Sequence, residues 1–586
     1  MKRLPYGISN YKTIAQENYI YIDKTPYIEK IENYHSPYLF FLRPRRFGKS
    51  LFVSLLQHYY DINEKDNFEA LFKDTYIGQN PTKERNSYYV LNFDFTGVTT
   101  DTEEQLEQSF INITKLAFND FTSRYKLTLD YVLKESDINV SAANMLEDFF
   151  TSVKNKIDKP VYVLIDEYDH FANELLSFQF NLFADSISKT GFVRKWYEVL
   201  KKQTKTIIKR IFATGVSPIT LDSLTSGFNI ADNITREEAF NEMMGFIEDE
   251  VRAMIRETAK FPMNESEMDA LMEVLHKNYN GYLFSEKAKE RLFNSDMILY
   301  YLKTYIEDKE GPMDLIDQNI ASDYGKLGKM FELKDKKGNM EVLEKILNGE
   351  DIVAQITRQF SMEKDFTTDD FKSLLFYLGL LTIDKRILSR VKLKVPNYVI
   401  KDLYFGYFEK KVREAINYEI DTVEISDAVS QIALEGKNNQ FILVIENTLY
   451  KLSNRGWSQA ELAARLCILD YISFDEKYIK LIMLSYFMLS KMYMVKSEYE
   501  VESGYIDIAL LRREPIDPDY FAIFEVKYIK KSEYEAYGEK IVEEKKNEAI
   551  AQILRYNTSN ELKNLSNLKK WVIVFAGDKC FANVEI

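Results

Sequence analysis

A glycine, a lysine and a serine, Gly48-Lys49-Ser50, stand between two apolar stretches of the chain. The preceding residues 38–42 (YLFFL) form a short apolar run that is typical of a buried strand. Apolar side chains then recur at helical spacing from Ser50 to Tyr60. A strand, a glycine-containing turn and a helix in this order predict a loop that holds a phosphate group, because backbone N–H groups and the helix dipole attract an anion there.

The loop departs from the usual phosphate-binding pattern at one position. That pattern is G-x-x-x-x-G-K-S/T, and Arg43 occupies the place of its first glycine. Glycine adopts a positive φ at such a corner at little steric cost, whereas arginine does so poorly, so Arg43 and Pro44 predict an altered entrance to the loop. On these residues alone, a modified nucleotide loop and a chance G-K-S in a basic turn are both open.

An acidic pair follows a second apolar run, PVYVLIDEYD at 160–169. In a nucleotide site, Lys49 would reach the β- and γ-phosphates and Ser50 would ligate Mg²⁺. Asp166 would hold the Mg²⁺ shell, and Glu167 would orient or deprotonate the attacking water. The loop and the carboxylates together predict nucleotide binding with Mg²⁺, and turnover is a separate prediction.

Further residues join this predicted nucleotide site. Arg45 and Arg46 add positive charge near the triphosphate, where they would help binding or act on a neighbouring copy of the chain. Thr214, near the end of a third apolar run, is placed to sense the γ-phosphate. The predicted nucleotide-binding residues are Arg45, Arg46, Phe47, Gly48, Lys49, Ser50, Leu51, Asp166 and Thr214.

The N-terminal half alternates nearly continuous apolar runs with helical stretches. This pattern predicts a parallel sheet that helices cover on both faces. Its expected strands are 38–42, 88–95, 160–169 and 209–217. After about residue 235 the pattern becomes helical, most clearly at 237–260. Residues 371–400 predict a helix followed by a two-stranded hairpin, which suits a winged-helix-like module, with a plain α/β insertion as the alternative.

A third pattern begins near residue 411 and predicts a second α/β core. An apolar helix at 476–494 precedes the strand-like segments 504–513 and 520–531. A charged helix runs through 543–556, and a strand at 569–577 is expected to close the chain.

Two carboxylates and a lysine fall on the neighbouring strands of that core. Glu525 and Lys527 are two residues apart, so their side chains share one face, and Asp507 on the paired strand can reach the same place. Two carboxylates with the backbone carbonyl of Val526 suit Mg²⁺, which prefers oxygen ligands. Lys527 would position or deprotonate a water and stabilise phosphate charge, as in phosphodiester hydrolysis. The alternative is an exposed Glu–Lys pair on an edge strand.

Several separated segments of the N-terminal half occur in a family-specific order: LPYGISNYKTIAQENYIYIDKTPYIEKI, RPRRFGKSL, LIDEYD, ATGVSPIT, GFIEDEV and YNGYLFS. Together they resemble the bacterial AAA-ATPase-like family over about half the chain. Members share the R-P-R-R-F-G-K-S loop, so the resemblance implies that Arg43 is a family trait. It also implies ATP binding within the P-loop fold. Asp23 and Lys24 are expected in a surface turn, with a place beside the nucleotide as the alternative.

The C-terminal motif carries a second resemblance. Asp507, Glu525 and Lys527 are followed by Gln552 and Tyr556, which lie four apart on one helical face. This D-x17-E-x-K spacing with Q-x-x-x-Y resembles the PD-(D/E)XK nuclease superfamily, especially its exonuclease-like branch. The usual proline before the aspartate is absent.

The second resemblance also implies a further metal ligand, because a carboxylate on the first helix often completes the metal site in that superfamily. Glu476 is the candidate, and Glu498 is the weaker one. The predicted metal ligands are therefore Ser50 and Asp166 at the nucleotide, and Asp507, Glu525, Val526 and Glu476 at the C-terminal centre.

Composition excludes some classes of protein. Two cysteines cannot build a disulfide framework or a thiolate zinc site. The net charge of −14 disfavours a protein that coats nucleic acid uniformly, but it leaves room for a local basic groove. The N-terminus lacks an apolar segment after its basic residues, and the longest apolar run, 481–490, is too short to span a bilayer. A cytoplasmic protein without a membrane partner is expected.

The sequence as a whole predicts a multidomain α/β protein. We expect a P-loop parallel-sheet ATPase domain at 1–235, a helical and winged-helix-like middle at 236–410, and a restriction-endonuclease-like α/β domain at 411–586. The expected function is that of an ATP-binding and hydrolysing protein with a Mg²⁺-dependent nuclease domain that acts on nucleic acid, with DNA favoured. DNA processing or defence against foreign DNA fits this combination, and a homo-oligomer is compatible with it.

Two other functions stay open. In the first, the chain is a signalling or scaffold ATPase whose nuclease-like domain binds nucleic acid or a partner without cleaving. In the second, Arg43 makes the N-terminal domain a nucleotide binder that does not turn over.

Overall fold

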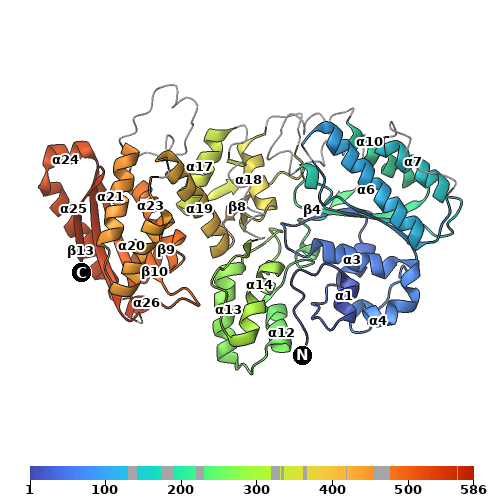
Figure 1. Cartoon of the computed structure of the whole chain (residues 1–586), viewed down its shortest axis with the longest axis horizontal. Coiled ribbons are helices and arrows are strands. Elements are labelled where there is room, and N and C mark those ends of the chain that lie inside the picture. Colours follow the sequence, from blue (N-terminus) through green and yellow to red (C-terminus); the bar gives the residue numbers. More distant parts are fainter. Residues whose placement is uncertain are drawn as a thin grey trace. The chain divides into compact units, whose positions relative to one another are not determined.

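The computed structural model describes most of the chain in two compact units (Figure 1). One unit comprises Met1–Lys309, Ile316–Asp335 and Ile352–Tyr398, and the other comprises Glu310–Leu315, Lys336–Asp351 and Val399–Ile586. The expected three-domain division stays a prediction. The described residues are 1–99, 101–129, 141–172, 191–218, 230–318, 330–331, 335–360, 366–417, 419–453, 475–557, 559–563 and 565–586.

A parallel five-stranded sheet forms the centre of the first unit. Its spatial order is β2-β3-β4-β1-β5, and every neighbouring pair is parallel. The four longer strands confirm the apolar runs expected from the sequence, because a sheet covered on both faces buries successive side chains. The strands are β1 (Tyr38–Leu42), β2 (Tyr89–Asp94), β3 (Val161–Asp166), β4 (Ile208–Gly215) and β5 (Asp232–Asn233).

Helices cover both faces of this sheet (Figure 1). The helices α6 (Glu103–Arg124), α7 (Ala142–Val153) and α10 (Phe192–Gln203) pack together on one face, and α3 (Lys49–Tyr60) lies on the other beside α1 (Tyr11–Gln16). Smaller elements complete this part: α2 (Pro26–Glu32), η1 (Ile62–Asn67), α4 (Phe68–Phe72) and α5 (Tyr76–Gln79).

The phosphate loop and the acidic pair come together because of the strand order. The loop follows β1 and the pair Asp166-Glu167 follows β3, while β4 lies between these two strands. The carboxyl ends of parallel strands share one edge of a sheet, so Lys49, Asp166 and Thr214 lie at the same edge.

The helical part of the first unit contains α12 (Glu248–Thr258), α13 (Glu265–Tyr279) and α14 (Ser295–Asp308). A continuous helix over 237–260 is therefore wrong. The chain forms a short 3-10 turn, η2 (Glu238–Phe240), and then breaks at Gly245, whose φ is 91°. A Cβ there would lie 3.1 Å from the Phe293 carbonyl oxygen and 3.2 Å from the Phe47 ring, so close approach to the phosphate loop requires the glycine.

The expected helix and hairpin within 371–400 are present. Helix α18 (Thr368–Tyr377) precedes β7 (Thr382–Ile387) and β8 (Arg390–Lys394). Strand β8 also pairs with β6 (Ile352–Ala354), so the hairpin belongs to an antiparallel three-stranded sheet of order β6-β8-β7.

A mixed five-stranded sheet forms the centre of the second unit, in the order β13-β12-β11-β10-β9. Strands β11 and β12 are parallel and the other pairs are antiparallel. The sequence reasoning missed β9 and β13, and β13 rather than 569–577 closes the chain. The strands are β9 (Met494–Val501), β10 (Gly504–Leu511), β11 (Phe521–Ile529), β12 (Leu568–Ala576) and β13 (Lys579–Glu585).

Two helices hold the second sheet between them (Figure 1). Val542, Ala549 and Ile553 of α25 (Glu539–Tyr556) join a buried cluster with side chains of β11 and β12. On the other face, Phe487 of α23 (Glu476–Leu489) packs on Phe524 with 5.3 Å between ring centroids. The remaining helices are α17 (Lys336–Leu347), α19 (Tyr398–Ala415), α20 (Thr422–Glu435), α21 (Asn439–Ser453), α24 (Lys531–Tyr537) and α26 (Asn560–Lys563). Among the described residues, no helix is both long and apolar enough to cross a membrane.

Candidate functional site

The phosphate loop places its left-handed residues at Arg46 and Gly48, with φ of 69° and 91°. Arg43 does not adopt a positive φ, so this loop does not require glycine at the first position of the pattern. The Lys49 ammonium donates to the carbonyl oxygens of Arg43 at 3.2 Å and Pro44 at 3.1 Å. The lysine thus closes the loop on itself.

The side chain of Arg43 links the phosphate loop to other parts of the first unit by hydrogen bonds. It is 1% exposed, and its guanidinium donates to the carbonyl oxygens of Leu42 at 2.9 Å, and of Thr235, Phe240 and Asn241 at 3.0 Å each. It also lies 4.1 Å from the ring centroids of Phe41 and Phe284. These contacts fix the loop to the segment after β5.

Replacing Arg43 with glycine restores the usual pattern but should destabilise the protein. The change leaves four buried carbonyl oxygens without their donor and opens a cavity, so we expect a loss of about 3 kcal/mol or more. Calorimetric unfolding measures it, with Arg45→Gly as the matched control. Equal melting temperatures for Arg43→Gly and wild type would contradict this role of Arg43.

Asp166 is held by two hydroxyl groups at the end of β3. Thr214 Oγ1 donates to Asp166 Oδ1 at 2.6 Å. Burial raises the pKa of Asp166, and the hydrogen bonds from Ser50 and Thr214 offset part of that rise. Thr214 is fully buried, and its hydroxyl positions Asp166. The expected role of Thr214 in sensing the γ-phosphate stays a prediction.

Glu167 is held in a strained conformation beside the loop, with φ of 51°. His170 Nδ1 lies 3.1 Å from Glu167 Oε2. Burial raises the pKa of Glu167, but the hydrogen bond with His170 and the charges of Lys49 and Arg45 outweigh it and lower the pKa to about 2. Glu167 is therefore ionised at neutral pH. Sequence reasoning missed His170, although its spacing of three from Glu167 was a signal.

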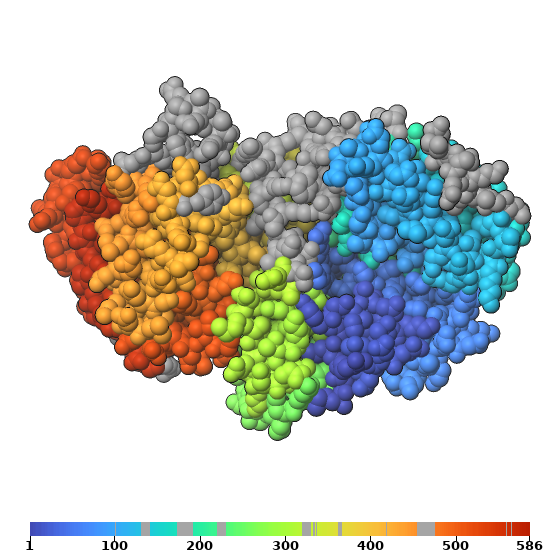
Figure 2. Space-filling view, viewed as in Figure 1, coloured from blue at the N-terminus to red at the C-terminus, as the bar shows by residue number. Residues whose placement is uncertain are grey.

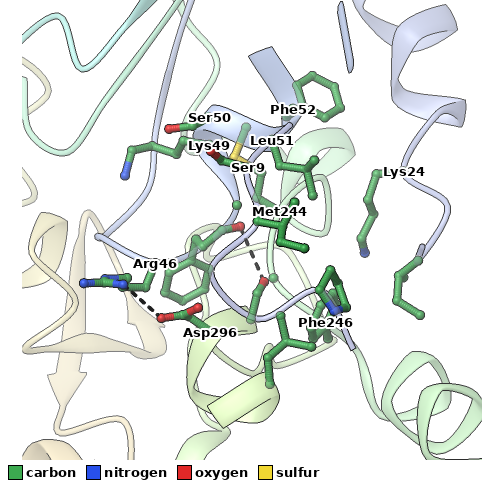
Figure 3. A pocket seen from close by; sticks show the side chains of 18 of the residues that line it. Ser9, Lys24, Arg46, Lys49, Ser50, Leu51, Phe52, Met244, Phe246 and Asp296 are labelled. Atoms are coloured by element: carbon green, nitrogen blue, oxygen red, sulfur yellow. Dashed lines mark hydrogen bonds and ion pairs between the residues drawn. The ribbon is translucent and has the colours of Figure 1, made fainter. Parts of the chain in front are cut away.

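A cavity of about 470 Å³ adjoins the loop (Figure 3). Arg45, Lys49 and Glu167 line its polar part, and Leu51, Met244, Phe246 and Leu299 belong to its apolar part. The N-terminal segment 5–24 supplies a further wall. Figure 2 shows the surfaces of this blue segment and of the green helical part in contact.

Lys24 belongs to this cavity and is not in a surface turn. It is buried, and its ammonium lies 2.6 Å from Glu250 Oε1 of α12 and 3.0 Å from the Glu242 carbonyl oxygen. Asp23 does form a turn, because its Oδ1 accepts hydrogen bonds from the backbone N–H and the hydroxyl of Thr25.

The start of α14 is bonded to the phosphate loop. The Asp296 N–H donates to the Arg46 carbonyl oxygen at 3.2 Å, and the Asn294 amide donates to that of Arg45 at 3.3 Å. Figure 3 shows the ion pair between Arg46 Nη1 and Asp296 Oδ2, 3.2 Å apart. These contacts join the loop directly to the start of α14.

The C-terminal strands bring Asp507, Glu525 and Lys527 together. Backbone pairing of β10 with β11 reaches Ile508 and Phe524. Beyond that pair, Asp507 Oδ2 accepts the Val526 N–H at 2.8 Å, and the Lys527 ammonium donates to Glu525 Oε1 at 3.3 Å. All three side chains are buried. Since β11 lies between β10 and β12, these residues are not an exposed pair on an edge strand.

Glu525 has the surroundings of a cation ligand. Its side chain is 2% exposed, and its Oε2 has no hydrogen-bond partner among the described residues. Burial and then the charge of Asp507 raise its pKa to about 8, although Lys527 and Lys480 pull it down. A divalent ion between the two carboxylates would relieve both the repulsion and the unpaired oxygen, so these donors fit Mg²⁺.

The raised pKa of Glu525 predicts a pH-dependent stability. The ordinary pKa of a glutamate is 4.5, so between pH 4.5 and about 8 the folded protein keeps a proton on Glu525 that the unfolded chain releases. The ionisation of Glu525 therefore lowers the stability of the metal-free protein as pH rises. Glu525→Gln should gain stability over wild type from pH 5 to 8.5, by at most about 1.4 kcal/mol per pH unit. Thermal unfolding in EDTA measures this difference. The same difference at every pH would contradict the shift.

Sequence reasoning missed one member of this centre, Lys480 of α23. Its ammonium lies 2.5 Å from Asp507 Oδ1, 3.1 Å from Glu476 Oε1 and 3.9 Å from Glu498 Oε1. The expected ligand Glu476 and its weaker alternative Glu498 are thus both near Asp507, but they face this lysine. Within the described ranges, no three His, Cys, Asp or Glu side chains are grouped to hold a metal ion.

Gln552 and Tyr556 lie on α25, against the face of the sheet that holds this centre. The Tyr556 hydroxyl donates to the Tyr505 carbonyl oxygen at 2.7 Å. Burial and then the charge of Glu525 raise the pKa of the Tyr556 hydroxyl. Gln552 Oε1 is buried without a hydrogen-bond partner among the described residues.

Two stretches of the chain match family models. Residues 5–225 match the predicted AAA-ATPase family, and residues 474–585 match the PD-(D/E)XK nuclease superfamily. Both resemblances found in the sequence are confirmed. The fold class is confirmed as well: a P-loop parallel sheet covered by helices, and a C-terminal mixed α/β sheet of the restriction-endonuclease-like type.

Individual relatives are distant. An uncharacterized protein in the vnfD 5′ region of Azotobacter chroococcum mcd 1 is 24% identical over 412 residues, which are 68% of this chain and 68% of that protein. Among solved structures, the Walker-type ATPase PABY2304 of Pyrococcus abyssi aligns with 65% of this chain and 94% of its own, at 12% identity and a TM-score of 0.36.

Proposed function

Because the chain joins an AAA-ATPase-like part to a PD-(D/E)XK nuclease superfamily part, we propose that it binds and hydrolyses ATP and cleaves phosphodiester bonds of nucleic acid in a Mg²⁺-dependent reaction. DNA is the proposed substrate, in DNA processing or defence against foreign DNA within a bacterial cytoplasm. One observation carries the nuclease part: Asp507, Glu525 and Lys527 converge in a buried centre, where Glu525 Oε2 has no hydrogen-bond partner among the described residues.

The first unit suits a nucleotide bound with its phosphates at the loop. Lys49 would exchange its two loop carbonyl partners for phosphate oxygens, and Ser50 and Asp166 would hold Mg²⁺. The apolar part of the cavity would take the base. Glu167, which is ionised and oriented by His170, would align the attacking water.

In the C-terminal centre, Asp507 and Glu525 would hold Mg²⁺ with the Val526 carbonyl. Bound there, the ion would polarise the phosphate and lower the pKa of a water. Lys527, fixed by Glu525, would position that water opposite the leaving oxygen. The water would lose one proton as its oxygen attacks phosphorus, one P–O ester bond would break, and the leaving oxygen would take up one proton, so that one water is consumed for each bond.

A second function is favoured by one contact. The Lys480 ammonium forms an ion pair with Asp507, a residue at which the metal would bind. In this alternative the chain is a signalling or scaffold ATPase, and its C-terminal domain binds nucleic acid or a partner without cleaving it.

Digestion assays separate the two functions. Linear, circular and single-stranded DNA and RNA are incubated with the full chain and Mg²⁺, with and without ATP. The nuclease proposal predicts that products form only with Mg²⁺ and disappear in Asp507→Asn. Intact substrates under every condition, with ATP turnover present, would support the second function instead.

A further inference from the structure

The carboxylates of the C-terminal centre already hold a cation, the ammonium of Lys480. It contacts Asp507 Oδ1 from β10, Glu476 Oε1 one helical turn before it on α23, and, at 3.9 Å, Glu498 Oε1 from β9. Carboxylates of α23, β9 and β10 thus surround one ammonium group.

This is an internal arrangement, unlike an ordinary surface pair. The Lys480 side chain is 14% exposed and that of Asp507 is 8% exposed. On the same helix, Lys477 is 63% exposed and pairs with Glu350, which is also partly exposed. A charge pair removed from water is screened little, so Lys480 has a strong effect on Asp507, whereas Lys477 is the kind of pair that contributes little.

Lys480 contacts one of the two carboxylate oxygens with which Asp507 would bind a metal. Asp507 Oδ2 accepts the Val526 N–H, and Lys480 lies 2.5 Å from Oδ1, the oxygen that this backbone group does not contact. Glu525 Oε1 accepts from Lys527, and its Oε2 has no hydrogen-bond partner in the part of the chain that the structure describes. A divalent ion held by Asp507 Oδ1 and by Glu525 would meet the positive charge of Lys480 at contact distance, so binding of the ion would favour displacement of the lysine.

We propose that Lys480 is a displaceable counter-ion of the metal centre, which competes with the divalent ion for Asp507 Oδ1. This inference rests on the proposed metal site. On displacement the ammonium keeps Glu476 and has Glu498 close by, so it stays charged and paired at the edge of the centre. There it is available to a phosphate group of nucleic acid, an anion that would hold the lysine away from Asp507 and so favour metal binding.

Metal titration of the full chain tests the competition without an activity assay. Mn²⁺ serves as the probe, because it takes oxygen ligands in octahedral geometry as Mg²⁺ does. Binding is followed by electron paramagnetic resonance of the free ion, without nucleotide, and Asp507→Asn defines the signal from this site. Lys480→Met keeps the length of the side chain but removes its charge. It should bind Mn²⁺ at least about tenfold more tightly than wild type, since a buried cation at contact distance is removed.

Control variants separate charge from folding. Lys477→Met, a matched change on the same helix, should leave Mn²⁺ affinity unchanged, and Lys480→Arg should keep the affinity of wild type because it keeps the charge. Lys480→Gln repeats the test if the methionine variant does not fold. Equal or weaker Mn²⁺ binding by the neutral variants, at a site that Asp507→Asn removes, would overturn the inference alone. If no variant, wild type included, shows an Asp507-dependent site, the proposed metal centre fails together with the inference.

Discussion

Replacing Lys527 with methionine is expected to abolish Mg²⁺-dependent cleavage of nucleic acid. The Lys527 ammonium is buried against Glu525 on a central strand, where the structure holds it beside both carboxylates. A positioned acid–base group contributes about 10²- to 10⁴-fold to a reaction rate, and loss of its charge also removes stabilisation of the phosphate. Initial rates on the best substrate from the digestion assay measure the loss.

The control for that variant is Lys540→Met, because Lys540 is an exposed lysine on α25 of the same unit. It should cleave at the rate of wild type. Metal binding by Lys527→Met, followed with Mn²⁺, shows whether the centre is still assembled. Unchanged cleavage by Lys527→Met would show that the nuclease activity comes from elsewhere or from a contaminant.

The second large effect is expected at Lys49. Lys49→Ala should weaken ATP binding by about two orders of magnitude and abolish turnover, because the ammonium of this buried lysine would pair with the β- and γ-phosphates in the proposed site. Fluorescent-nucleotide binding and phosphate release measure the two effects. Cleavage by this variant, with and without ATP, also tells whether nucleotide state controls the C-terminal centre.

Glu167→Gln is the informative partner of that variant. It removes the charge that orients the water but keeps Lys49 and Ser50 in place, so ATP should still bind while turnover falls about 10²- to 10⁴-fold. The same rate in wild type, Lys49→Ala and Glu167→Gln would contradict the site. Binding without turnover in wild type would instead make the first unit a silent nucleotide binder.

Local patterns predicted the parts of the fold that depend on neighbouring residues. The four long strands of the first unit are buried on both faces, so they appear in the sequence as continuous apolar runs. The convergence of Asp507, Glu525 and Lys527 followed from the two-residue period of a strand and the pairing of β10 with β11.

Other features depended on residues far apart in the chain. Arg43 is explained by carbonyl groups at Thr235–Asn241, nearly two hundred positions later. Lys480 meets Asp507 across 27 positions, and nothing in the local pattern of α23 indicates that contact. The break at Gly245 was hidden within a helix-like pattern. Only three of the eight β9 residues and none of the seven β13 residues are buried, so these edge strands lack a strong apolar signal.

Crystals grown with Mn²⁺ and measured at the Mn absorption edge show whether Asp507 and Glu525 hold one divalent ion. We expect an anomalous peak in the second unit at coordination distance, about 2.1 Å, from both Asp507 and Glu525, with the Lys480 ammonium moved off Asp507 Oδ1. A well-diffracting crystal in which Asp507 still holds Lys480 and Mn²⁺ occupies only the site at Ser50 and Asp166 would contradict it.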